Sequence, residues 1–170
     1  TPFRKRFILL FALALMPGLL FANAGSATHD ENSVIVDNTD SGFAVISGTW
    51  NTSTILPGYY GSNYRTSPSG SGENKVRWTP DIPASGKYNV YVWYTADTNR
   101  AVNAPYAIHY SGGSTTVAVN QKINGSQWVR LGSFPFDAGT SGYVELSNQA
   151  NGYVIADAVR FERDLLFSDD

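Results

Sequence analysis

Hydrophobic and polar residues alternate over short runs along this chain, and a period of two residues indicates β-strands. One face of the clearest run carries Tyr88, Val90, Val92 and Tyr94. The other face carries Asn89, Tyr91 and Trp93. Because both faces hold large apolar groups, neither can lie fully in water without loss of stability, and the run predicts a central strand of a sheet.

Other short runs rich in β-branched and aromatic residues are separated by turn residues such as Gly, Asn, Asp, Ser and Pro. We expect strands over 34–37, 43–47, 75–78, 87–94, 105–110, 115–119, 127–131, 143–146 and 153–161. The segment 111–114, Ser-Gly-Gly-Ser, predicts a hairpin between two of them. Eight or nine short strands without a convincing helix after residue 24 predict an all-β fold, a β-sandwich of the jelly-roll type.

The segment 51–72 fits neither a helical nor an alternating period. It is rich in Gly, Ser, Asn, Thr and Tyr, and its centre reads Leu-Pro-Gly-Tyr-Tyr-Gly-Ser-Asn-Tyr-Arg. We expect a long loop here, and long irregular loops in compact domains often carry function.

The last predicted strand places a carboxylate among large apolar residues. Alternation puts Asp157 on the same face as Ile155 and Val159, which points it toward the core. A buried carboxylate must be paired, heavily hydrogen-bonded or bound to a metal. Two interpretations follow: backbone amides or Arg100 satisfy Asp157, or it shares a structural calcium ion with Asp37 or Asp40 near the first strand.

The N-terminus has the composition of a secretory signal peptide. Basic residues at positions 4–6 precede an almost wholly apolar run over 7–21, and Ala-Asn-Ala follows at 22–24. We therefore expect a signal peptide over 1–24, a flexible lead-in over 25–33, a β-sandwich domain over 34–162 and a C-terminal tail over 163–170. The chain is expected to be secreted, extracellular or periplasmic.

The net charge limits the possible binding partners, and the cysteine content limits how the domain can be stabilised. Without residues 1–24 the chain has nine basic and fourteen acidic residues, a formal net charge of −5. This balance argues against binding of nucleic acid, or of an anionic membrane after signal cleavage, through charge alone. Because the chain has no cysteine, the domain must rely on its core, with a metal as a possible addition.

Several segments together resemble the golvesin C-terminal-like domain, the xanthan-lyase-type accessory domain of secreted bacterial proteins. The matching segments are 35–38, 48–50, 58–64, 78–80, 86–94, 119–121, 128, 131–132 and 151–161. This resemblance implies a galactose-binding-like jelly roll that attaches to a polysaccharide or cell-wall polymer. It supplies no catalytic residues, and the xanthan lyase label does not imply a lyase activity of the module itself.

Sugar binding requires aromatic faces that stack on pyranose C–H surfaces, with polar side chains beside them for the hydroxyl groups. We expect the ligand-binding residues to be Trp50, Tyr59, Tyr60, Asn63, Tyr64, Arg65 and Trp128. We expect Trp78, Tyr88 and Trp93 to lie in the core instead, because a sandwich must fill its interior.

Catalytic motifs are poorly represented. The sequence lacks a P-loop, a zinc-binding H-E-x-x-H and a G-x-S-x-G elbow, and of its two histidines His109 lies within a predicted strand. We therefore expect no enzyme activity, with a small hydrolase supported only if His109 and a carboxylate converge in a cleft.

Two functions of different class remain. The first is a secreted, non-catalytic module that binds a polysaccharide or cell-wall glycan. The second is a structural or adhesive surface protein that self-assembles or binds protein partners through its Tyr-rich loop.

Overall fold

The computed structural model describes residues 32–166 of the 170-residue chain. The predicted signal peptide lies outside the described residues, as do most of the lead-in and residues 167–170 of the tail. Within the described part no helix has the length and apolar character needed to cross a membrane.

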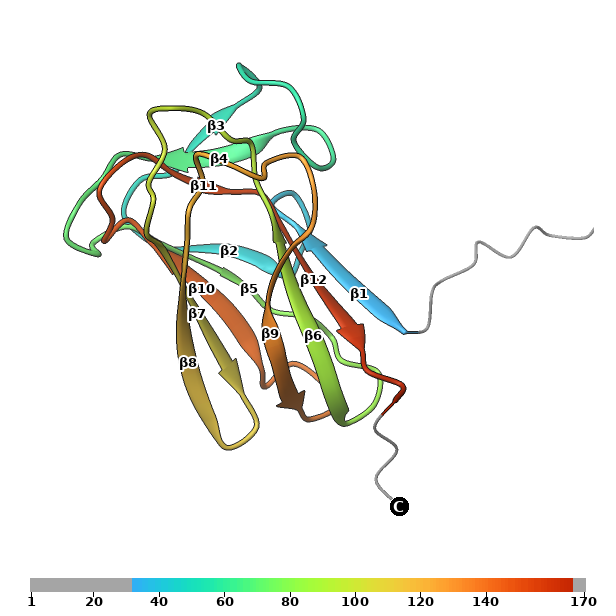
Figure 1. The fold of residues 1–170 in the computed structure, drawn as a ribbon. Coiled ribbons are helices and arrows are strands. Elements are labelled where there is room, and N and C mark those ends of the chain that lie inside the picture. The colour runs from blue at the N-terminus through green and yellow to red at the C-terminus, as the bar shows by residue number, and fades with distance from the viewer. Residues whose placement is uncertain (1–31, 167–170) are drawn as a thin grey trace, which may run out of the picture.

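Within residues 32–166, twelve strands form three antiparallel sheets (Figure 1). The strands are β1 (Ser33–Asp37), β2 (Phe43–Ser47), β3 (Asn51–Ser53), β4 (Tyr64–Ser67), β5 (Lys75–Trp78), β6 (Gly86–Trp93), β7 (Ala104–Tyr110), β8 (Gly113–Val119), β9 (Val129–Phe136), β10 (Tyr143–Ser147), β11 (Val154–Ala156) and β12 (Ala158–Arg163). The order β1-β12-β6-β9 makes a four-stranded sheet, and β2-β5-β10-β7-β8 makes a five-stranded sheet. The third sheet, β11-β4-β3, lies across one end of this sandwich (Figure 1). The predicted all-β sandwich is confirmed.

The side chains of β6 alternate between buried and partly exposed positions, as the sequence predicts. Its inward residues Tyr88, Val90 and Val92 are completely buried, and its outward residues are partly exposed. β6 lies between β12 and β9, so it is an interior strand, as predicted.

Trp78 of β5 lies at the centre of the core. Its ring stacks on Tyr106 with 6.2 Å between ring centroids and meets Phe43 edge-on at 5.4 Å. Its indole Nε1–H donates to the carbonyl oxygen of Asp157 at 3.1 Å. Trp78 therefore joins the five-stranded sheet to the chain between β11 and β12, and its predicted core position is confirmed together with that of Tyr88.

β1 pairs with β12 along its whole length. The register runs from Ser33 opposite Glu162 to Asp37 opposite Ala158. β12 continues this register with β6, where Ala158 lies opposite Trp93. Asp37, Asp157 and Trp93 therefore come to the same end of the four-stranded sheet, the end near the third sheet (Figure 1).

The structure has more strands than the eight or nine expected. The segment 51–72 contains β3 and β4, whose mostly polar residues give no hydrophobic alternation in the sequence. The expected strand 153–161 divides at Asp157, because β11 pairs with β4 in the third sheet whereas β12 pairs with β1 and β6. The predicted hairpin across 111–114 is present as β7 and β8, with Tyr110 opposite Gly113.

Candidate functional site

The loop over 58–63 is fastened to the end of the four-stranded sheet. The backbone N–H of Tyr60 donates to Asp157 Oδ2 at 3.0 Å, and Trp93 Nε1–H donates to the carbonyl oxygen of Gly58 at 2.8 Å. Gly61 has a φ of 63°, and a side chain there would meet both carboxylate oxygens of Asp37 at 3.1 Å. The loop therefore requires glycine at this position and takes a defined path over the two aspartates.

Three aromatic rings from distant parts of the chain meet beside this loop. Tyr60 comes from the loop, Trp93 from the outward face of β6 and Trp128 from the residue before β9. Their centroids are 5.8 Å apart for Tyr60 and Trp93, and 5.3 Å apart for each of the other two pairs. All three side chains remain partly exposed. We call this cluster of Tyr60, Trp93 and Trp128 the aromatic platform.

Arg160 borders the aromatic platform on the outward face of the four-stranded sheet, and Arg130 lies farther along the same face. The guanidinium of Arg160 lies 5.0 Å from the Trp128 ring and 4.3 Å from the Tyr91 ring, and its Nη2 contacts Glu162 at 3.0 Å. Arg130 donates to Asn89 Oδ1 from both Nε and Nη2. These contacts hold both guanidinium groups in place, and the Arg160 group offers further N–H donors beside the Trp128 ring.

The structure separates the seven predicted ligand-binding residues into different environments. Tyr60 and Trp128 belong to the aromatic platform, whereas Trp50 and Tyr64 are only 5% and 2% exposed and pack in the core. Tyr59 packs on Tyr64, with 6.1 Å between ring centroids. The rings of Trp50 and Tyr64 therefore belong to the core, and Tyr59 is partly buried against it.

The two remaining residues of that set have polar surroundings. Asn63 accepts a hydrogen bond from Asn38 Nδ2 at 2.8 Å through its Oδ1, which ties the loop to the end of β1. Arg65 lies in β4, opposite Ala156 of β11 and Thr52 of β3. Neither contact includes a ring of the aromatic platform.

Trp93 is the member of the aromatic platform that sequence reasoning placed elsewhere. We expected a core side chain, but the indole lies on the outward face of β6 and is partly exposed. The signal was present in the alternation, since Trp93 shares its face with Asn89 and Tyr91 and faces away from Val90 and Val92.

Asp37 and Asp157 are both buried under the loop, at 5% and 0% exposure. Burial raises the pKa of Asp157 to about 8; the hydrogen bond from Tyr60 N–H lowers it, and the charge of Asp37 raises it further. Among the described residues, Asp37 Oδ2, Asp157 Oδ1 and the Oδ1 of Asn38 have no hydrogen-bond partner. Asp37 lies close enough to Asp157 to affect its pKa, and Asn38 follows Asp37 in the chain, so these three buried oxygen acceptors without donors lie on adjoining segments.

The contacts do not support the interpretation that Arg100 pairs with the Asp157 carboxylate. Arg100 donates to Asn99 Oδ1 at 2.9 Å and to the Tyr64 hydroxyl at 3.5 Å. Oxygen atoms are the ligands that calcium prefers, so Asp37, Asn38 and Asp157 fit a cation of this type. Within residues 32–166 no three His, Cys, Asp or Glu side chains gather around one point, so such an ion would need amide or carbonyl oxygens in addition.

His109 and a carboxylate do meet, but on the outward face of the five-stranded sheet. His109 Nε2 lies 3.5 Å from Glu145 Oε2, and the imidazole stacks on Tyr143. Glu145 also accepts from Arg77 at 3.2 Å, and the Arg77 guanidinium lies over the Tyr143 ring at 3.9 Å. This is a cross-strand network of paired side chains, an arrangement that stabilises sheets.

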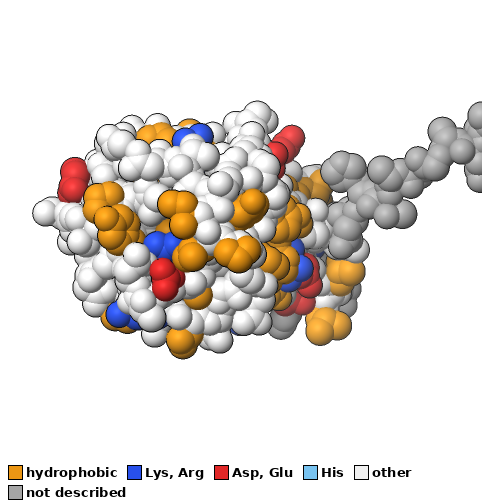
Figure 2. All heavy atoms as spheres, turned by 90° about the horizontal axis from the view of Figure 1, so that it is seen from above, with side chains coloured by type: hydrophobic (Ala, Val, Ile, Leu, Met, Phe, Trp, Pro, Cys, Tyr) orange, Lys and Arg blue, Asp and Glu red, His pale blue; other side chains and the backbone are white. Residues whose placement is uncertain are grey.

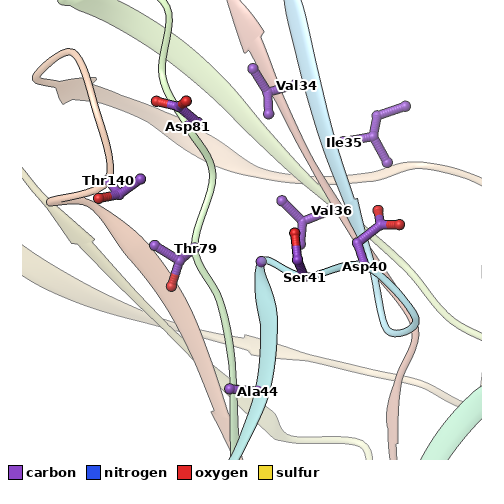
Figure 3. A pocket seen from close by; sticks show the side chains of 10 residues that line it. Val34, Ile35, Val36, Asp40, Ser41, Ala44, Thr79, Asp81 and Thr140 are labelled. Atoms are coloured by element: carbon purple, nitrogen blue, oxygen red, sulfur yellow. The ribbon is translucent and has the colours of Figure 1, made fainter.

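A cleft opens where the edges of the two large sheets face each other (Figure 3). It has a volume of about 560 Å³ between β1, the start of β2 and the segment after β5. Val34 and Val36 lie on the β1 side, and Asp81 and Thr140 lie across from them (Figure 3). The exposed apolar side chains Val45 and Ile46 of β2 lie on the same edge of the sandwich.

Comparison with known proteins gives one family and two informative structures. A model of the golvesin C-terminal domain family matches residues 34–163. The xanthan lyase of Bacillus sp. (strain GL1) is 39% identical over 134 residues, which is 76% of this chain and 14% of the lyase. The structure of a Paenibacillus xanthan lyase matches with a TM-score of 0.75 and 40% identity, over 79% of this chain and 13% of that one.

A more distant structure has nearly the same size as this domain. A family 35 carbohydrate binding module from an environmental isolate matches with a TM-score of 0.58 and 17% identity, over 76% of this chain and 93% of the module. At this identity the match shows a common fold. By contrast, this chain spans about a seventh of the length of the xanthan lyase that it matches.

Proposed function

The chain belongs to the golvesin C-terminal domain family, and from this premise we propose that it is a non-catalytic module that binds a polysaccharide or cell-wall glycan. The observation that carries the proposal is the aromatic platform of Tyr60, Trp93 and Trp128. Its rings are partly exposed, mutually fixed and bordered by Arg160. Such a surface offers apolar faces for sugar rings and N–H donors for their hydroxyl groups.

The relatives support a glycan as the ligand. The fold is that of a carbohydrate binding module, and the segment matched in xanthan lyase belongs to a protein whose name specifies a polysaccharide substrate. We propose that the chain is secreted, with residues 1–24 as its signal peptide. The basic start, short apolar run and Ala-Asn-Ala sequence support this assignment.

We further propose that Asp37, Asn38 and Asp157 bind calcium beneath the 58–63 loop. The support is the set of three buried oxygens without donors and the extreme burial of Asp157. The same carboxylate accepts from the Tyr60 N–H, so a cation here would fix the loop that carries one ring of the aromatic platform. The role is structural: it positions Tyr60.

Affinity electrophoresis tests the proposed glycan binding. The chain is run through gels cast with xanthan, alginate, chitosan, cellulose derivatives or peptidoglycan fragments. We expect retardation by at least one polymer, and Trp128→Ala should weaken that binding at least tenfold, about 1.4 kcal/mol, because the variant removes one ring of the aromatic platform.

The matched control is Tyr143→Ala. Tyr143 is also a partly exposed ring with an arginine over its face, but it lies on the opposite sheet. Its removal should leave retardation unchanged. If no polymer retards the chain, or if both substitutions weaken retardation equally, glycan binding at the aromatic platform is wrong.

The second candidate function, self-assembly, has one observation in its favour. Val45 and Ile46 are 44% and 45% exposed on the edge strand β2, next to the cleft of Figure 3. An exposed apolar edge strand can pair with a second copy. Sedimentation velocity distinguishes the functions: a binding module should sediment as a monomer at all concentrations, whereas assembly gives a size that increases with concentration and decreases in Val45→Lys.

A further inference from the structure

A second concave site lies at the end of the sandwich that the third sheet covers. It has a volume of about 220 Å³ and lies between β3–β4, the turn over 97–100 and Tyr153. In Figure 2, which views this end, hydrophobic side chains gather around basic and acidic side chains near the centre. We call it the Arg100 pocket; its lining includes Ile55, Tyr64, Asp97, Asn99, Arg100 and Tyr153.

Arg100 is fixed in this pocket although no carboxylate holds it. Its side chain is 6% exposed, donates to Asn99 Oδ1 and the Tyr64 hydroxyl, and lies 5.9 Å from the Tyr64 ring centre. Among residues 32–166 no carboxylate oxygen lies within 4.0 Å of it, and its Nε–H has no partner. Structural arginines at such burial are normally paired, so this placement requires another explanation.

The backbone around Arg100 is equally well defined. Arg100 and Tyr153 form a parallel β-bridge, in which Ala101 N–H donates to the Tyr153 carbonyl and Tyr153 N–H donates to the Asn99 carbonyl. The turn over 97–100 is closed by a hydrogen bond from Arg100 N–H to the Asp97 carbonyl. The pocket walls are therefore pre-formed, which lowers the entropy cost of binding a ligand.

The bonds to Arg100 leave both donors and acceptors for a ligand. Because Asn99 uses Oδ1 to accept, its Nδ2 hydrogens can donate, and because the Tyr64 oxygen accepts, its O–H can also donate. Asp97 accepts from Thr98 through Oδ1, and no described residue bonds its Oδ2. A mixed set of donors and acceptors suits hydroxyl groups, which need both.

Charge and size indicate what kind of ligand fits. The negative charge of Asp97 opposes the positive charge of Arg100, so the pocket favours a neutral ligand over a carboxylate. The volume is below the roughly 300 Å³ at which pockets for drug-sized ligands begin, which suits a single ring. The rim supplies an exposed aromatic face, Tyr153 at 45%, and the apolar side chain of Ile55.

We propose that the Arg100 pocket binds one neutral sugar residue at a chain end or branch of the glycan, as a subsite separate from the aromatic platform. The polar array of Arg100, Asn99 and Asp97 holds the hydroxyl groups, and Tyr153 stacks on the ring. This inference rests on the proposed function, which it extends by naming the unit that the glycan must present.

Saturation-transfer NMR on the chain tests the proposal with free monosaccharides. The probes are glucose, mannose, galactose, rhamnose and N-acetylglucosamine, with glucuronate as the anionic counterpart. We expect saturation transfer to at least one neutral sugar and weaker transfer to glucuronate. Tyr153→Ala and Asp97→Asn should each weaken binding of that sugar at least fivefold.

Trp128→Ala separates this proposal from the function on which it rests. It should reduce polymer retardation but leave monosaccharide binding intact, because Trp128 is not part of the Arg100 pocket. The proposal is overturned if no neutral sugar binds while polymer retardation persists, if Tyr153→Ala and Asp97→Asn have no effect, or if the original chain binds glucuronate more strongly than every neutral sugar. The substitution at Tyr153 is at an exposed ring, so circular dichroism should confirm an unchanged fold.

Discussion

Trp78→Ala is expected to lower the free energy of unfolding by about 3–5 kcal/mol, the cost typical of removing a large buried aromatic side chain. Trp78 is completely buried and packs against Tyr106 and Phe43. The substitution also removes the donor to the Asp157 carbonyl, which leaves a buried acceptor unsatisfied. Because the net stability of a small domain is only roughly 5–15 kcal/mol, this loss would be a large fraction of the total.

Urea denaturation followed by circular dichroism measures this loss. Trp128→Ala is the control, because it removes the same side chain from a partly exposed position and should cost much less. A loss below about 1 kcal/mol in Trp78→Ala would mean that the two sheets do not depend on this residue for their packing.

Calcium is expected to raise the melting temperature of the chain by on the order of 10 °C at a concentration a hundredfold above its dissociation constant. Binding to the folded state alone contributes about 2.7 kcal/mol under that condition, and for a domain of this size each kcal/mol shifts the midpoint by several degrees. This stabilisation would come from coordination of the ion by the buried oxygens of Asp37, Asn38 and Asp157.

Differential scanning calorimetry measures the melting temperature with calcium, with magnesium and with a chelator. Asp157→Asn should abolish the calcium shift, yet without calcium it should be no less stable than the original chain, because the amide carries no charge to bury. Asp137→Asn, at an exposed position, should keep the full shift. An unchanged melting temperature with calcium and with chelator would exclude the cation site and leave Asp157 as a neutral, protonated side chain.

The sequence alone could predict the parts of the fold that alternation encodes. β6, the β7–β8 hairpin and the core position of Trp78 all follow from local pattern and turn chemistry. The third sheet could not be predicted in this way. β3 and β4 consist mostly of Ser, Thr, Asn and Arg, and they become strands only because β11 and the loops around them provide partners.

The candidate site depends on contacts between segments far apart in the chain. Tyr60, Trp93 and Trp128 are aromatic in the sequence, but only the pairing of β6 with β9 and the bond from Trp93 to Gly58 bring their rings together. The alternation of β6 places Trp93 on the outward face, but only that pairing shows which rings it meets. The sequence also could not show that Arg100 lacks a carboxylate partner, because this depends on how far the fold places each carboxylate from it.

The pairing of β1 with β12 has a consequence for how this domain can be joined to other proteins. Ser33 lies opposite Glu162, and Arg163 N–H donates to the Asn32 carbonyl, so the two ends of the described segment leave the domain side by side. A host protein could receive the segment as an insertion within one surface loop without separating the flanking residues. Because Trp93 and Asp157 lie at the opposite pole, an inserted copy would point its aromatic rings away from its host.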